Sequence, residues 1–230
     1  MEFWQHITAL GGLSFTGPLA LLVAVLMAAR GRVELALFWC VVFGGAMVAV
    51  VASKVAFLGW GIGIREWGMA GFSGHAARAA AIFPVVCFLL FQDSGKKKVL
   101  NTAVVAGMVL GALASWSRVE VRAHTVSEAL FGFALGTAVA LIFIQRALHE
   151  PRIQLRIVLL ALCASLLVLM PEREPVDTEK WMTVLAMKLA GHDRPYQRWS
   201  WQPKRTPYTV RCRPGEVLRG YACYWPKGNH

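Results

Sequence analysis

Two short polar segments interrupt an otherwise apolar sequence, and they contain the residue types that catalytic sites use. The first is 72–75 (sequence FSGH) and the second is 117–128. Both contain histidine and serine, and the second adds arginine and glutamate. The apolar stretch between them is long enough to cross a lipid bilayer and return. A hairpin of two membrane helices would therefore bring both segments to the same membrane face, where they could form one site.

The second polar segment has a pattern typical of an activated nucleophile. Glu128 follows His124 by four residues, and on a helix this spacing places carboxylate and imidazole on one face. A carboxylate bonded to one ring nitrogen fixes the tautomer and makes the other nitrogen more basic. His124 is therefore a candidate nucleophile oriented by Glu128. The plainer alternative is a histidine and glutamate pair at the protein surface.

His75 and Lys54 carry weaker signals when each is taken singly. Ser-Gly-His is a common tripeptide, and a buried, hydrogen-bonded histidine is an ordinary structural feature. Lys54 lies inside an apolar run, where a lysine either extends to the interface or serves a site in the bundle. His75, His124 and Glu128 could also be drawn as a metal-binding set. The neighbouring cations Lys54 and Arg118 favour an anion instead, so we predict neither a metal nor a cofactor.

The elements that position these residues are predicted to be membrane helices. The chain is 57% hydrophobic and only 16% charged, and about twenty apolar residues span the hydrocarbon core as a helix. Six stretches have roughly this length: 13–29, 35–58, 76–91, 99–116, 126–145 and 155–170. We therefore predict an all-α fold, with a six-helix transmembrane domain over residues 1–170. The second stretch is rich in small residues, which predicts a close approach by another helix. These residues are Gly44, Gly45, Ala46, Ala49, Ala52 and Ser53.

The basic residues predict the orientation of the bundle. The net charge is +11, but the cations gather in alternate loops, and this excludes a nucleic-acid-binding patch. In the first, third and fifth loops they are Arg30, Arg32, Lys96, Lys97, Lys98, Arg146, Arg152 and Arg156. The positive-inside rule places these loops in the cytoplasm. Both termini and both polar segments would then lie on the periplasmic side of a bacterial inner membrane.

Residues 171–230 are predicted to form a small extracytoplasmic cap. Within them, 177–190 has the pattern of a short amphipathic helix that Gly191 can end. All four tyrosines of the chain lie in this tail, and aromatic residues among basic ones suit a membrane surface. The alternative is a solvated appendage whose aromatic residues form a miniature core.

The end of the tail predicts a β-hairpin. The segments 208–213 and 217–225 flank Pro214-Gly215, a strong turn signal. Cys212 and Cys223 lie in these segments, and an oxidising compartment would let them form a disulfide.

The polar residues, taken together, resemble the three motifs of the PAP2 superfamily. This family comprises membrane-bound type 2 phosphatidic acid phosphatases related to the vanadium haloperoxidases. Its pattern has a lysine and Arg-Pro, then Pro-Ser-Gly-His, then Ser-Arg, five residues, His, three residues and Asp. The positions that match in order and spacing are Lys54, Ser73, Gly74, His75, Ser117, Arg118 and His124. The resemblance implies a six-helix plan over about residues 13–170 and does not cover the tail.

Three departures from that pattern stand out. Phe72 replaces the proline of the second motif, and Glu128 replaces the aspartate of the third with a longer carboxylate. Gly61 stands where the first motif has its arginine. One phosphate-binding cation is therefore missing or supplied from elsewhere, and the candidates are Arg65, Arg78 and Arg122.

The resemblance implies a division of roles in the site. The expected phosphate-binding residues are Lys54, Arg118, Ser73, Gly74 and Ser117. His124, oriented by Glu128, would attack phosphorus and form a phosphohistidine, and His75 would protonate the leaving group. Fixed cations would stabilise the charge of the transition state.

The function implied is an integral membrane lipid phosphatase. Its substrate would be a phosphate monoester or diphosphate ester of a lipid at the outer face of the membrane. Two alternatives stay open. A lipid phosphotransferase would use the same phosphohistidine, and a non-catalytic lipid-binding scaffold would need no chemistry at all.

Overall fold

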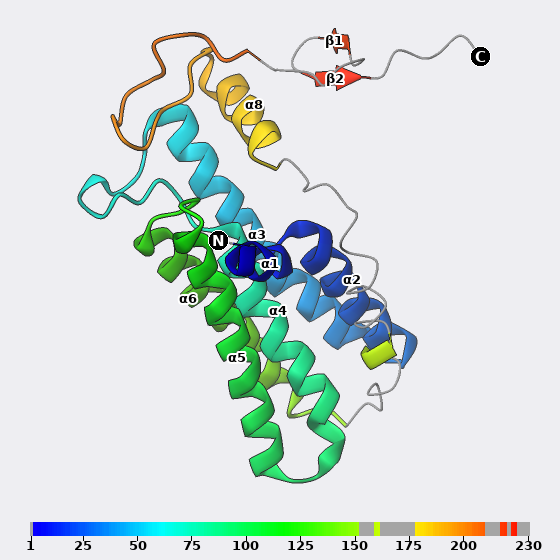
Figure 1. Cartoon of the computed structure of the whole chain (residues 1–230). Coiled ribbons are helices and arrows are strands. Elements are labelled where there is room, and N and C mark those ends of the chain that lie inside the picture. The colour runs from blue at the N-terminus through cyan, green and yellow to red at the C-terminus, as the bar shows by residue number, and fades with distance from the viewer. Residues whose placement is uncertain (1, 152–158, 162–177, 210–216, 220–221, 225–230) are drawn as a thin grey trace.

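The computed structural model describes residues 2–151, 159–161, 178–209, 217–219 and 222–224, and within them helices dominate (Figure 1). The helices are α1 (Glu2–Leu10), α2 (Leu13–Ala29), α3 (Val33–Trp60), α4 (Gly74–Phe91), α5 (Lys97–Glu120), α6 (Val126–Ala147) and α8 (Thr178–Ala190). Two 3-10 turns, η1 (Arg65–Trp67) and η2 (Gln92–Ser94), and two strands, β1 (Val217–Arg219) and β2 (Ala222–Tyr224), are the other elements. The predicted helical bundle is therefore confirmed.

Five helical segments are long and apolar enough to cross a membrane. They are Phe3–Ala29, Val33–Trp60, Gly74–Ser94, Lys97–Glu120 and Val126–Ala147. These segments contain the first five predicted stretches, and the first of them joins α1 to α2 through a bend at residues 11–12. Of the sixth predicted stretch only 159–161 is described, as helix. The count of six therefore lies outside the described residues.

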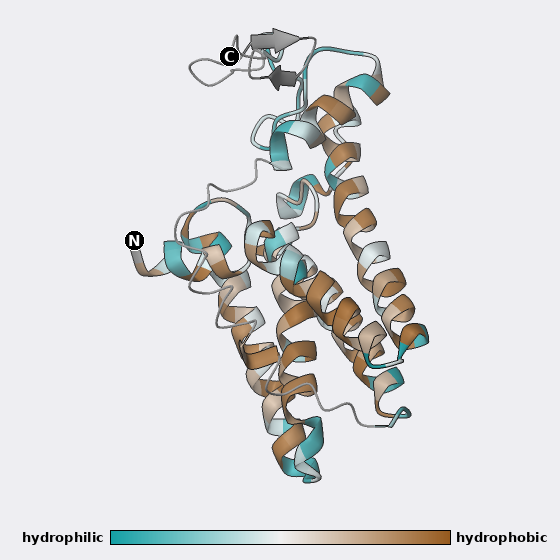
Figure 2. Cartoon of the chain, turned by 90° about the vertical axis from the view of Figure 1, so that its right-hand side faces the viewer, coloured by the Kyte–Doolittle hydropathy of each residue, from teal (hydrophilic) through white to brown (hydrophobic). Residues whose placement is uncertain are grey.

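The outward faces of these helices are apolar, as lipid contact requires. Large exposed side chains include Leu21, Val25, Leu37, Val41, Val48, Val105 and Val109. Soluble proteins rarely expose an apolar surface of this extent, whereas hydrocarbon tails solvate it. Figure 2 shows hydrophobic colour along the helices and hydrophilic colour gathered at their ends. The chain is a membrane protein.

The helices run alternately up and down, which divides the polar loops between two ends of the bundle. We call the end with 61–73 and 121–125 the upper end, as in Figure 1, and the end with 30–32 and 92–96 the lower end. Both polar segments singled out in the sequence lie at the upper end. The predicted hairpin geometry is therefore confirmed.

Helix α4 is the centre of the bundle and packs between α5 and α6. Its first turns are built of alanines that are fully buried. Glycines on both neighbours face it: a Cβ at Gly111 of α5 would lie 2.9 Å from Cα of Ala80, and one at Gly132 of α6 would lie 2.6 Å from the carbonyl oxygen of Ser73. Backbones can approach this closely only where side chains are absent.

The small residues of α3 do not all face a neighbour. A Cβ at Gly44 or Gly45 would meet no described atom within 4 Å. Ala46 is buried in the core, and Ser53 contacts the loop before α4 through the amide of Phe72.

The tail returns to the upper end of α3. Helix α8 packs along α3 (Figure 1), and a Cβ at Gly59 would lie 3.3 Å from the carbonyl oxygen of Ala186. The predicted helix 177–190 is confirmed within one residue, and it ends at Gly191 in the left-handed region with φ 72°. The division of the chain at residue 170 stays a prediction.

The predicted β-hairpin of 208–213 with 217–225 is not confirmed, because residues 210–216 lie outside the described residues. Strands β1 and β2 pair antiparallel, with Leu218 opposite Cys223, so two short strands lie where a single strand over 217–225 was predicted. Cys212 lies outside the described residues, and the predicted disulfide stays a prediction.

Candidate functional site

The second motif forms the first turn of α4 at the upper end. Ser73 is the N-cap of α4, and its Oγ accepts a hydrogen bond from the amide of Ala76 at 3.5 Å. The Ser73 amide donates to the carbonyl oxygen of Glu128 at 3.1 Å, which joins the second motif to the third. Gly74 follows the cap, where an added Cβ would lie 3.1 Å from Nη1 of Arg78.

Phe72, which replaces the motif proline, has a structural use here. Its amide donates to Oγ of Ser53 at 3.0 Å, a bond that proline has no N–H to make. Ser53 precedes Lys54 on α3, and Gly71 packs so closely on α3 that a Cβ there would lie 3.0 Å from Cγ of Lys54. The first and second motifs are therefore held side by side.

The third motif brings imidazole and carboxylate into direct contact. Nδ1 of His124 lies 2.7 Å from Oε2 of Glu128, as the four-residue spacing predicts. The reason differs from the predicted one, because His124 precedes the helix instead of lying on it. Thr125 is the N-cap of α6, and Thr125 and Glu128 form a capping box. The capping box turns the Glu128 side chain back toward His124.

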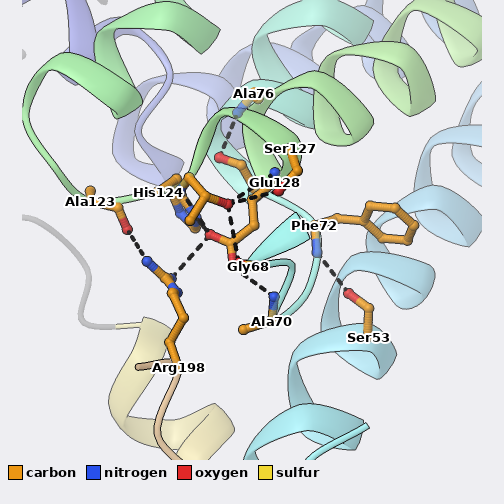
Figure 3. Close-up of polar contacts among 12 residues, drawn as sticks. Ser53, Gly68, Ala70, Phe72, Ala76, Ala123, His124, Ser127, Glu128 and Arg198 are labelled. Atoms are coloured by element: carbon orange, nitrogen blue, oxygen red, sulfur yellow. Dashed lines mark hydrogen bonds and ion pairs between the residues drawn. The ribbon is translucent and has the colours of Figure 1, made fainter. Parts of the chain in front are cut away.

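Glu128 is the most connected side chain of the site (Figure 3). It is 1% exposed, and its Oε1 accepts a hydrogen bond from the amide of Ala70 at 2.9 Å. Its Oε2 also lies 3.1 Å from Nη2 of Arg198, an arginine of the tail. A buried carboxylate needs such partners to remain charged. Helix α6, the loop before α4 and the tail therefore meet at one carboxylate.

His75 lies on the side of the site that faces the bend between α1 and α2. Its Nδ1 lies 3.4 Å from Nη2 of Arg78, and a Cβ at Gly12 would lie 3.9 Å from its Nε2. Arg78 is itself held by Oγ1 of Thr16 at 3.0 Å and by the carbonyl oxygen of Gly11 at 3.3 Å. Arg78 is therefore a neighbour of His75 that is anchored to the N-terminal segment.

Ser117 and Arg118 lie in the last turn of α5, and their side chains have different surroundings. Ser117 is fully buried, and its hydroxyl donates to the carbonyl oxygen of Ala114 at 2.7 Å. Arg118 donates through Nη1 to Oγ1 of Thr8 on α1 at 2.9 Å. Among the described residues the buried Nε of Arg118 has no hydrogen-bond partner. This guanidinium keeps a donor for an anion.

Lys54 lines a cavity of about 500 Å³ between the upper end of α3, the third-motif loop and the tail. Within the described residues, Lys54 makes no hydrogen bond or ion pair. Four further cations line the same cavity, and they are Arg122, Lys180, Arg198 and Lys204. Glu179 is the one carboxylate among the described lining residues. The cavity therefore has the charge of an anion-binding site.

The candidate cations from the sequence occupy three different places. Arg65 is exposed on η1 and does not line the cavity. Arg78 lies beside His75, away from that lining, and Arg122 lines the cavity from an exposed position with φ 56°. Among the described residues no group of three metal-ligating side chains gathers.

Burial is the main influence on the pKa of the His124 imidazole. It lowers the pKa of His124 below the usual value of 6.5, while the hydrogen bond to Glu128 raises it in part and the charge of Lys54 lowers it further. The imidazole is therefore neutral at neutral pH. Neutral imidazole has the free electron pair that a nucleophile needs.

Sequence reasoning missed Arg198, Thr8 and Ala70. Arg198 lies in 192–207, a stretch without regular periodicity, and it follows Glu128 by 70 residues. Thr8 lies on the short helix α1, and Ala70 lies in the loop before α4. The one signal in the sequence was the predicted extracytoplasmic cap over 171–230, the segment that contains Arg198.

Comparisons with known proteins agree with the motif positions. The sequence profile of the PAP2 superfamily matches residues 52–152, a range that contains all three motifs. An "Uncharacterized 22.5 kDa protein in cps region" of Klebsiella pneumoniae is 40% identical over 144 residues, which are 61% of this chain and 68% of that protein. No solved structure matches. The matched range, the relative and the order of the motifs together establish that this chain belongs to the PAP2 superfamily.

Proposed function

We propose that the protein is a membrane phosphatase that hydrolyses a phosphorylated lipid through a phosphohistidine. Members of the PAP2 superfamily are generally phosphatases. The observation that carries the proposal is the buried hydrogen bond between His124 and Glu128 at 2.7 Å, next to a cavity lined by cations. A carboxylate that holds Nδ1 leaves Nε2 as the reacting atom.

The proposed reaction has two steps that share one histidine. In the first, Nε2 of His124 attacks phosphorus, the N–P bond forms and the P–O bond to the leaving group breaks. His75 gives its proton to the departing oxygen. In the second, water attacks the phosphohistidine, returns a proton to His75 and releases inorganic phosphate, which restores both histidines.

Cations of the upper end support this chemistry by stabilising negative charge. Lys54 and Arg118 hold nonbridging phosphate oxygens, the arginine through its unpartnered Nε. Ser73 and Gly74 at the start of α4 add donors where the helix dipole favours an anion. Ser117 is buried and bonded within its own helix, so its contribution is to pack the end of α5.

A lipid substrate is supported by the depth of the site. Exposed tryptophans surround the upper end: Trp60 on α3, Trp67 on η1, Trp116 on α5, Trp181 on α8 and Trp199 in the tail. Tryptophan prefers the headgroup region of a bilayer. We therefore place the site at headgroup depth, and the positive-inside rule puts this end on the periplasmic side. The tail is proposed to be an extracytoplasmic cap.

The test is phosphate release in detergent from p-nitrophenyl phosphate and from a panel of lipid phosphates. We expect His124→Ala to lower the rate by about 10³-fold or more. His149→Ala, at the lower end, is the matched control and should keep the wild-type rate. Hydrolysis that survives His124→Ala would refute the assigned nucleophile.

The same assay separates the other two functions. Phosphate transfer to an added lipid or sugar hydroxyl, without release of free phosphate, would show a phosphotransferase. A folded wild-type protein that releases and transfers no phosphate from any substrate of the panel would favour the scaffold. Acid-labile phosphate on wild-type protein but not on His124→Ala would support the covalent intermediate.

A further inference from the structure

The tail of the protein occupies the place of the missing motif arginine. Gly61, which stands at that position, ends α3 in the left-handed region with φ 71°. A Cβ at this glycine would lie 2.6 Å from ring atoms of Tyr196. No side chain fits there while the tail is docked, since both the backbone conformation and the tyrosine ring exclude it.

The docking of the tail on this end of α3 is specific. The amide of Tyr196 donates to the carbonyl oxygen of Leu58 at 2.9 Å. Nε1 of Trp201 donates to the carbonyl oxygen of Gly61 at 2.9 Å, and Nε2 of His192 lies 2.6 Å from that of Gly59. These bonds satisfy the last carbonyl groups of α3, which a helix end leaves without partners. They also set the position of the residues between 192 and 201.

Arg198 lies within that docked segment and extends into the site (Figure 3). Its Nη2 lies 3.1 Å from Oε2 of Glu128, and its Nη1 donates to the carbonyl oxygen of Ala123 at 3.4 Å. Both partners belong to the third-motif region, on either side of His124. Arg198 also lines the same cavity as Lys54. Its side chain is 31% exposed, and its buried Nε has no partner among the described residues.

We propose that Arg198 is the phosphate-binding cation that Gly61 does not provide. The inference rests on the proposed phosphatase function and deepens it. The segment that fills the space of the motif arginine also brings a guanidinium to the cavity. Glu128 holds this guanidinium in place before an anion enters. The planar donors of Arg198 would then bind nonbridging oxygens of the phosphoryl group in the cavity that Lys54 also lines.

The other arginines near the site are less suited to this task. Arg78 is already bonded to Thr16 and Gly11, and Arg65 is exposed outside the cavity. Arg122 lines the cavity, but its guanidinium has no hydrogen bond or ion pair with any described residue that would orient it. Arg198 alone among these four arginines combines a cavity position with an ion pair to Glu128.

The test measures inhibition by orthovanadate, an anion that mimics the phosphoryl transition state. We expect Arg198→Ala to weaken vanadate inhibition by about 10- to 100-fold, the effect of removing one charge-assisted hydrogen bond. Arg198→Lys should recover part of this loss. Arg194→Ala is the matched control, because Arg194 lies in the same tail and pairs with Asp193 at the surface. Equal inhibition of Arg198→Ala and Arg194→Ala would overturn the proposal.

A second variant separates anion binding from support of Glu128. In Glu128→Gln protein the ion pair to Arg198 is lost. If Arg198 served only to hold the Glu128 carboxylate, Arg198→Ala would not change vanadate affinity in this background. If Arg198 binds the anion, Arg198→Ala must still weaken vanadate binding in the Glu128→Gln background. If the Glu128→Gln variant and the double variant Glu128→Gln, Arg198→Ala bind vanadate equally well, the proposal is overturned.

Binding measured by calorimetry keeps this inference distinct from the proposed function. If wild-type protein hydrolyses no ester, the phosphatase assignment fails, while vanadate affinity in wild type and Arg198→Ala still decides whether Arg198 holds an anion. If wild type is active and Arg198→Ala retains full vanadate affinity, the phosphatase stands and the role of Arg198 is refuted.

Discussion

The upper and lower ends of the bundle carry the same kinds of charged residue in opposite surroundings. At the lower end, Glu150 pairs with Arg146 one helical turn away and with Arg32, and its side chain is 23% exposed. At the upper end, Glu128 is 1% exposed and pairs with His124 and with Arg198 from the tail. Exposed ion pairs contribute little, whereas a buried charge depends on its partners.

The packing of the helices differs between the ends as well. Near the upper end, the glycines of α6 let it touch the backbone at the start of α4. At the lower end the same helices leave a cavity of about 630 Å³ that is lined mostly by apolar side chains of α4, α5 and α6. The two ends therefore differ in how deeply their charged residues are buried and how closely their helices pack, and not in the presence of charge.

The largest expected effect is the difference in phosphatase rate between two variants, each of which removes one carboxylate from one end of the bundle. Glu128→Gln should lower the phosphatase rate by about 10²- to 10⁴-fold, because the neutral amide no longer stabilises the charged imidazole or fixes its tautomer. Glu150→Gln should leave the rate within about twofold. Steady-state kinetics in detergent measure both, and a comparable loss in the two variants would contradict the contrast between the ends.

Adding one methyl group to α6 at Gly136 should have an intermediate effect, which is a loss of stability. A Cβ at Gly136 would overlap the carbonyl group of Ala77, so Gly136→Ala should lower the free energy of unfolding by about 1–3 kcal/mol through overpacking. Gly44→Ala, where the described structure leaves open space, should be neutral or slightly stabilising. Thermal or denaturant unfolding in detergent makes the comparison. Equal stability of the two variants would show that α6 does not pack tightly on α4.

The smallest expected effect is a shift in pH dependence. Burial lowers the pKa of His124 below 6.5, and the nucleophile must be neutral. The rate should therefore fall with acid only below pH 6.5, with its midpoint at the lowered pKa. Removing the carboxylate in Glu128→Gln should move that midpoint further down, since the hydrogen bond raises the pKa. A midpoint above 6.5 in wild type would contradict the buried position of His124.

The helices and the contact between His124 and Glu128 were predictable from local patterns. Apolar runs predicted the first five membrane segments, and the spacing of His124 and Glu128 predicted their contact. Of the small residues predicted to allow a close approach, Gly44 and Gly45 face open space whereas Ala46 is buried, because composition does not say which face of a helix meets a neighbour. Of the predicted β-hairpin, the described residues test only the single strand over 217–225, where the structure has two short strands that pair with each other.

The sequence by itself determined the membrane helices, the order of the motifs and the family, since hydropathy and motif spacing are local properties of the chain. Only the tertiary structure decided that the tail docks on α3 and that Arg198 meets Glu128. The contact of Arg198 with Glu128 joins residues 70 positions apart, and the docking contacts join α3 to residues more than 130 positions later. Arg198 also lies in a stretch without regular periodicity. The docking contacts depend on helix-end carbonyl groups and on a left-handed glycine at position 61, which acquire their partners only when the chain has folded.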